Sequence, residues 1–198
     1  CSQAARESCS ERILFIDADV RLKKYTSLRA LSEAHEGGID LLSLAPRLTC
    51  SCLSEWMVQP IMASLLSMGF PIKATNNKSN KTAFAAGPFM FFRHASYKAI
   101  GGHSAIAGEV VEDLALASKI KSSGFNLRFL LGLDSIDLGM YSNLAELWEG
   151  WSKNWFIGLD RSIIKSIGAS IIVFIIFTFP WIIIPSSVIY MIVSAQVY

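Results

Sequence analysis

Arg12-Ile13-Leu14-Phe15-Ile16-Asp17-Ala18-Asp19 is the stretch that decides the fold. Its first five residues form a short apolar run with β-branched side chains, which predicts a buried strand. The run ends abruptly in two carboxylates one residue apart. Ligands of open α/β sheets bind outside the carboxyl ends of the strands, so we expect Asp17 and Asp19 to lie at a ligand site.

Strand-like and helix-like segments alternate as far as residue 140. The further predicted strands are 39–44, 89–92 and 126–131, and the predicted helices are 26–35, 53–68, 94–100 and 112–122. The polar stretch 73–81 lacks apolar periodicity and is predicted to be a loop. This alternation is typical of an α/β domain with a mostly parallel sheet and helices on both faces.

The C-terminal part of the chain is apolar enough to cross a membrane. Residues 166–198 carry no charge, and one span needs about 20 apolar residues. Because two serines follow Pro185, we expect a break there, with one span over 163–184 and the start of a second that is cut off at residue 198. The alternative is a buried hairpin of a soluble core, which the all-round apolar character of 171–177 disfavours.

A tryptophan-rich stripe precedes this apolar run. Leucines and tryptophans recur at helical spacing over 144–159, which favours a helix lying in the membrane interface over a helix packed in a core. Lys153, Arg161 and Lys165 flank the span, and positive flanks stay cytosolic, so we expect a multi-pass membrane protein with a cytosolic catalytic domain. The predicted regions are the domain 1–140, the interfacial segment 141–162 and the membrane helices 163–198.

Composition narrows the class of protein further. A net charge of +2 gives no reason to expect a nucleic-acid partner. The four cysteines have no zinc-site spacing. The chain begins with Cys1 and ends inside an uncharged run, so we expect a fragment truncated at both ends that is unstable and inactive when expressed alone.

Two pairs of acidic residues are the candidates for metal binding and catalysis. Asp17 and Asp19 at one strand end are costly unless something positive lies between them, and Mg²⁺ is usually held by one or two carboxylates plus substrate phosphates. The alternative to a metal site at Asp17 and Asp19 is a simple turn without a bound ligand. Glu112 and Asp113 open a predicted helix, where acids are also favoured by the helix dipole. A carboxylate facing a pocket from a helix start is nevertheless a sound general base.

These segments, taken in order, resemble a known family. Residues 15–19 resemble the DxD segment of family 2 glycosyltransferases with the GT-A fold, and 87–103 resemble the acceptor-site strand and the helix after it. Residues 112–116 resemble the ED motif, and 140–154 are similar to the interface segment of membrane-bound members. The most similar members act on lipids such as hopanoids, carotenoids or ceramide. The resemblance implies a partial, Rossmann-like GT-A domain.

The resemblance also implies roles for single residues. Asp19, assisted by Asp17, would hold Mg²⁺ or Mn²⁺ on the diphosphate of a nucleotide-sugar donor such as a UDP-sugar. Asp113 would be the base that takes a proton from a lipid or membrane-associated hydroxyl, and Glu112 would support it or hold the acceptor. The sugar would then be transferred with inversion.

The remaining expected contacts with substrate are supported by weaker sequence signals. Gly87, Pro88 and His103 would line the acceptor site, although a lone histidine is more often structural. Many processive members carry a Gln/Arg-x-x-Arg-Trp motif, whereas 151–155 read Trp-Ser-Lys-Asn-Trp, which argues for transfer of a single sugar. Lys153 is the candidate substitute as a diphosphate contact.

Two other classes of function compete with this interpretation. Residues 16–20 also match the haloacid-dehalogenase phosphatase pattern, in which Asp17 would be the nucleophile. That superfamily places this strand near the start of its domain and rarely ends in paired membrane spans. The other alternative is a catalytically degenerate membrane scaffold, against which the presence of both acidic pairs speaks.

Overall fold

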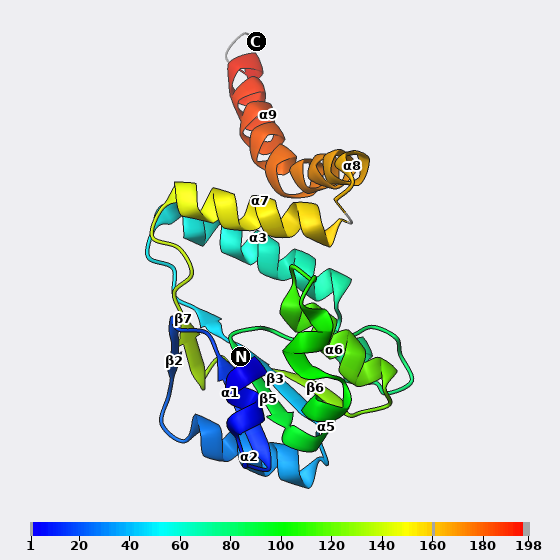
Figure 1. The fold of residues 1–198 in the computed structure, drawn as a ribbon. Coiled ribbons are helices and arrows are strands. Elements are labelled where there is room, and N and C mark those ends of the chain that lie inside the picture. The colour runs from blue at the N-terminus through cyan, green and yellow to red at the C-terminus, as the bar shows by residue number, and fades with distance from the viewer. Residues whose placement is uncertain (1, 160, 196–198) are drawn as a thin grey trace. The chain divides into compact units, whose positions relative to one another are not determined.

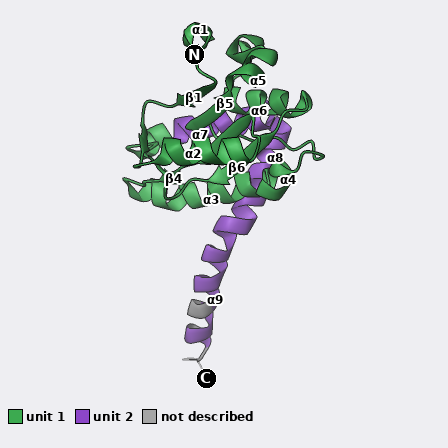
Figure 2. Ribbon diagram, turned by 90° about the horizontal axis from the view of Figure 1, so that it is seen from below, with its two compact units in different colours: residues 1–147 green, residues 148–198 purple. Residues whose placement is uncertain are grey.

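The computed structural model describes residues 2–159 and 161–195 in two compact units, Cys1–Leu147 and Trp148–Tyr198 (Figure 2). The first unit is a mixed α/β domain. Its elements in chain order are α1 (Ser2–Glu7), β1 (Arg12–Ile16), β2 (Val20–Leu22), α2 (Thr26–Glu36), β3 (Leu41–Ala45), β4 (Arg47–Leu48), α3 (Leu53–Gly69), α4 (Ile72–Asn76), β5 (Phe89–Arg93), α5 (His94–Ala99), the 3₁₀ helix η1 (Gly102–Ile106), α6 (Glu112–Ser122), β6 (Leu127–Leu131) and β7 (Ile136–Leu138).

The strands form two mixed sheets (Figure 1). The larger has the order β1-β5-β3-β6, in which β5 is antiparallel to both neighbours and only β3 and β6 are parallel. The smaller has the order β2-β7-β4. The α/β class is therefore correct, but the expectation of a mostly parallel sheet is wrong. The long connection through α3 and α4 returns the chain to the end of the sheet where β3 finishes, so that β5 runs back, antiparallel, between β1 and β3.

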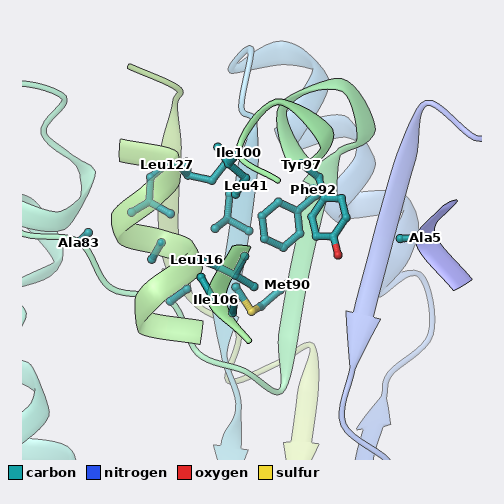
Figure 3. Packing of buried hydrophobic residues seen from close by; sticks show 13 residues of the cluster. Ala5, Leu41, Ala83, Met90, Phe92, Tyr97, Ile100, Ile106, Leu116 and Leu127 are labelled. Atoms are coloured by element: carbon teal, nitrogen blue, oxygen red, sulfur yellow. The ribbon is translucent and has the colours of Figure 1, made fainter. Parts of the chain in front are cut away.

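The larger sheet has helices on both faces, as expected. Met90 and Phe92 of β5 belong to the core cluster beneath α5 and α6, which Figure 3 shows from close by. The alternate residue Phe89 joins the opposite cluster with Ala30 and Ala34 of α2. This period-two alternation follows from the pleat of the strand. Burying each large apolar side chain contributes about 1.5 to 3 kcal/mol, so both faces stabilise the sheet.

One element departs from the predicted loop over 73–81. Residues Ile72–Asn76 form the short helix α4. The side chain of Asn76 donates to the carbonyl oxygen of Phe129 at 2.9 Å and accepts from its N–H group at 2.7 Å. A tertiary contact with the edge strand β6 thus holds this turn, and a search for apolar periodicity does not detect such a contact.

The second unit is helical. It contains most of α7 (Leu144–Gly158), followed by α8 (Ile163–Val173), a π-helical segment η2 (Phe174–Thr178) and α9 (Phe179–Ala195). In the part of the chain that the structure describes, Ile163–Ile192 is the one helix long and apolar enough to cross a membrane. It has 30 residues, and its most apolar window of 18 residues has a mean hydropathy of 2.6.

The expected break at Pro185 is absent, so the described residues hold one candidate span where two were expected, and the multi-pass topology stays a prediction. Pro185 lies inside α9. The hydroxyl of Ser186 donates to the carbonyl oxygen of Ile182 at 2.6 Å, and Ser187 donates to Ile184 at 2.9 Å. Because both hydroxyls are satisfied within the helix, the serines need no turn. The expected end of the second span at 196–198 lies outside the described residues.

Gly102 provides a test of the packing between η1 and α5. Its φ of +52° is in the left-handed region, and an added Cβ would lie 2.4 Å from the ring of Tyr97. We expect Gly102→Ala to lower the free energy of unfolding by about 2 to 4 kcal/mol through backbone strain and overpacking. Thermal and urea unfolding of the detergent-solubilised protein measure this loss.

The matched control is Gly108→Ala. No atom lies within 4 Å of the added Cβ there. Equal stability losses in the two variants would contradict the packing shown by the structure.

Candidate active site

The first acidic pair lies where β1 ends. Ile16 pairs with Phe89 in the antiparallel ladder between β1 and β5, so Asp17 follows β1 at the edge where Pro88 precedes β5. The carbonyl oxygen of Asp17 accepts from the N–H group of Val20 at 3.3 Å, which closes a turn containing Asp19. Both carboxylates are exposed at this edge.

The second acidic pair is attached to the same edge. The N–H group of Gly87 donates to Oδ2 of Asp113 at 3.0 Å, and the N–H group of Leu114 donates to Oδ1 at 2.8 Å. A Cβ at position 87 would lie 3.3 Å from Oδ2, so glycine allows this close approach. The start of α6 is thereby bonded to the residues that precede β5.

A buried serine holds the loop beneath this bond. Oγ of Ser43 on β3 accepts from the N–H group of Ala86 at 2.8 Å and donates to the carbonyl oxygen of Ala86 at 3.1 Å. Ser43 is fully buried, and it positions the residue directly before Gly87. Sequence reasoning missed this role; the available signal was a single hydroxyl inside the apolar run 39–44.

The carboxylates influence one another. Burial raises the pKa of Asp113, the N–H bonds from Leu114 and Gly87 act in the opposite direction, and the charge of Asp17 raises it further. Partial burial raises the pKa of Asp17, and the charge of Asp19 adds to this effect. Burial is the largest cause of both shifts, and the negative charge of a neighbouring carboxylate adds to each of them.

His103 and Glu112 lie on the neighbouring side. Nδ1 of His103 is 2.6 Å from the hydroxyl of Tyr97, and the ring packs edge-on against Phe15 with centroids 4.8 Å apart. Burial lowers the pKa of His103, while the charge of Glu112 raises it. Tyr97, which sequence reasoning did not single out, therefore connects β1 with η1. Its signal in the sequence was a tyrosine shortly before Gly101 and Gly102.

The structure brings most of the predicted site residues together. Asp17, Pro88, Gly87 and Asp113 meet at one sheet edge, and Asp19 follows in the adjoining turn. Lys153 lies in α7 within the second unit, where its side chain is exposed. Its expected role as a diphosphate contact stays a prediction.

The donor atoms at this edge suit a hard divalent cation that is shared with a substrate. Among the described residues no group of three or more His, Cys, Asp or Glu side chains forms a complete metal site. Asp17 and Asp19 offer carboxylate oxygens, and Mg²⁺ commonly takes only one or two of these together with substrate phosphates. These residues therefore fit Mg²⁺ or Mn²⁺ bound jointly with a diphosphate, and they do not fit a structural zinc.

Known proteins similar to this chain are glycosyltransferases. No family model matches the chain. The 4,4'-diaponeurosporenoate glycosyltransferase of Staphylococcus aureus strain MRSA252 is 27% identical over 161 residues, which are 80% of this chain and 43% of that protein. Its counterpart in strain USA300 is 26% identical over the same length. The match thus covers less than half of these relatives.

These relatives confirm the resemblance that the motifs indicated. Both relatives are named for sugar transfer, which differs from the phosphatase and scaffold alternatives.

The raised pKa of Asp113 predicts a pH-dependent cost in stability. The folded protein holds this proton more tightly than the unfolded chain, so stability falls as the pH rises from the ordinary aspartate value through the raised one. Asp113→Asn removes this titration, but it also sets an amide NH2 group against one of the two N–H donors, so we expect the stability of the variant relative to the parent to rise by about 0.5 to 2 kcal/mol from pH 4 to about pH 8. Chemical unfolding between pH 4 and about pH 8 measures the effect.

Asp137→Asn is the control, because the pKa of Asp137 is shifted in the opposite direction from that of Asp113. The hydrogen bond from Arg47 lowers the pKa of Asp137, and Lys23 adds to this effect, so its charge stabilises the fold above the ordinary aspartate value. This variant should be less stable than the parent at pH 7. A stability of Asp113→Asn relative to the parent that does not rise between pH 4 and about pH 8 would contradict the electrostatic account of the site.

Proposed function

We propose that this chain forms the metal-binding and base-bearing part of an inverting, family 2 glycosyltransferase with a partial GT-A fold. The enzyme would transfer a single sugar from a nucleotide sugar, a UDP-sugar in particular, to a lipid or membrane-associated hydroxyl. The observation that carries the proposal is the bond between Gly87 and Oδ2 of Asp113, which holds this carboxylate at the edge where β1 ends in Asp17. The mixed sheet with helices on both faces is compatible with such a domain.

The donor would be held at the end of β1. Asp19, with help from Asp17, would bind Mg²⁺ or Mn²⁺ on the diphosphate. The bound cation would offset the negative charge that develops on the departing diphosphate. The mutual repulsion of the carboxylates at this edge supports the assignment, because a cation shared with a phosphate group relieves it.

Asp113 would act as the general base. Its oxygens are fixed by two N–H donors, and its raised pKa makes the ionised carboxylate a better proton acceptor than an exposed aspartate. It would take the proton of the acceptor hydroxyl while the hydroxyl oxygen forms a bond to the anomeric carbon. The bond between that carbon and the diphosphate oxygen breaks on the opposite side, which inverts the configuration.

The remaining predicted residues would serve the acceptor and the membrane. Glu112 would support the base or hold the acceptor, and Gly87, Pro88 and His103 would line the acceptor's path. Lys153 would contact the diphosphate. The candidate span Ile163–Ile192 is compatible with a catalytic domain kept at the cytosolic face, next to a lipid acceptor.

Replacing the base tests the catalytic role. In the full-length protein that carries residues 1–198, Asp113→Asn should lower kcat for sugar transfer by about 10²- to 10⁴-fold while the protein stays folded. Mass spectrometry of the glycosylated lipid product measures the rate. Asp134→Asn, which changes an exposed aspartate after β6, is the matched control and should keep parental activity. Transfer at the parental rate by Asp113→Asn would refute the assignment.

Replacing the metal ligand tests the donor site. Mn²⁺ and UDP together should raise the Tm of the parent protein more than either does alone, because each completes the other's binding site. Asp19→Ala should abolish the combined shift, whereas Asp113→Asn should retain it. Equal shifts in Asp19→Ala and the parent would argue against a metal at the end of β1. Phosphate-ester hydrolysis lost on Asp17→Asn would instead support the phosphatase alternative.

A further inference from the structure

Helix α3 buries two polar side chains and exposes several large apolar ones. Glu55 and Gln59, one helical turn apart, are 1% and 3% exposed. On the opposite face Trp56 is 66% exposed and Met57 is 65% exposed. Other large apolar side chains that are exposed along the helix are Leu53, Leu66 and Met68. A helix facing water ordinarily shows the reverse pattern.

Hydrogen bonds fix this orientation. Oε2 of Glu55 accepts from the N–H group of Ser51 at 2.7 Å, and Oε1 accepts from the N–H group of Tyr141 at 3.1 Å. Nε2 of Gln59 lies 3.7 Å from Sδ of Met140. Rotating α3 to hide its apolar face would leave the buried carboxylate without these donors, which is costly. The hydrogen bonds of Glu55 therefore keep the apolar face of α3 exposed on the surface of the first unit.

The charged residues that follow Trp56 in the sequence are all basic as far as Gly108, since this stretch contains no aspartate or glutamate. Lys73, Lys78 and Lys81 follow the helix, and all three side chains are exposed. None of the three forms an ion pair with another residue in the described part of the first unit. An apolar helix face next to unpaired lysines suits a surface that is apolar within and anionic at its boundary.

We propose that α3 and the three lysines dock the first unit on an anionic lipid bilayer. Trp56 and its apolar neighbours would enter the headgroup and acyl boundary, where tryptophan is favoured, and the lysines would contact lipid phosphates. The candidate span in the same chain keeps a bilayer within reach. A second copy fits this face less well, because it would bring the same three lysines into the interface. This inference concerns membrane attachment and does not depend on the proposed sugar transfer.

A fluorescent label on α3 tests the proposal in the intact chain. The four natural cysteines are replaced by serine, Met57→Cys is labelled with an environment-sensitive dye, and the protein is placed in nanodiscs of phosphatidylglycerol and phosphatidylcholine that hold one copy each. We expect blue-shifted emission and quenching by spin labels attached to the lipid. Met68→Cys repeats the test at the other end of the helix.

Leu28→Cys on α2 is the matched control, since Leu28 is also an apolar helical side chain and is 63% exposed. Its label should stay in water and escape lipid-borne quenching. Each Lys→Gln change at 73, 78 or 81 should lower the ratio of docked to undocked protein by about fivefold. Equal quenching at positions 57 and 28 would overturn the proposal. So would a blue-shifted label at 57 that lipid quenchers do not reach, because protein would then cover the helix.

Discussion

The N–H group of Gly87 donates to the carboxylate of Asp113, and this bond joins the entrance of β5 to the first turn of α6. Two features of the fold make this hydrogen bond possible. The antiparallel pairing of β1 with β5 brings the end of β1 alongside Pro88, and the packing of Leu116, Ala117 and Ile120 holds α6 on the sheet. Residues almost a hundred positions apart in the sequence thus share one sheet edge. The catalytic assignment depends on that convergence.

The charges of the domain are distributed unevenly. Asp137 is paired with Arg47 and Lys23 in the smaller sheet, where its role is structural. Among the described residues Asp17, Asp19 and Asp113 form no ion pair, although their charges act on one another. A protein keeps such repulsion where a cation or a positively charged substrate group is to be bound. The same unequal distribution sets α3 and its lysines apart from the rest of the surface.

Local sequence patterns predicted much of this fold. The apolar run at 12–16 and the acidic helix start at 112 correspond to β1 and α6 with the predicted bounds. The direction of β5 was not predictable in this way, because a strand pattern does not say from which end of the sheet the chain enters. Pro185 was misinterpreted because its following serines can donate within a helix as well as form a turn.

The candidate site was predictable to a similar degree. Carboxylate pairs at the ends of elements are visible in the sequence, and the strand register then brings Asp17 and Asp113 to one edge. Ser43 and Tyr97 escaped notice because their hydroxyls act through tertiary contacts with Ala86 and His103.

The most direct test of this account is the titration of Asp113 followed by NMR of ¹³C-labelled aspartate, in the parent protein and in Asp17→Asn. If the two acidic pairs share one site, removing the charge of Asp17 lowers the pKa of Asp113. An unchanged pKa of Asp113 in Asp17→Asn would mean that the two carboxylates are too far apart to act on one substrate, and would contradict the account.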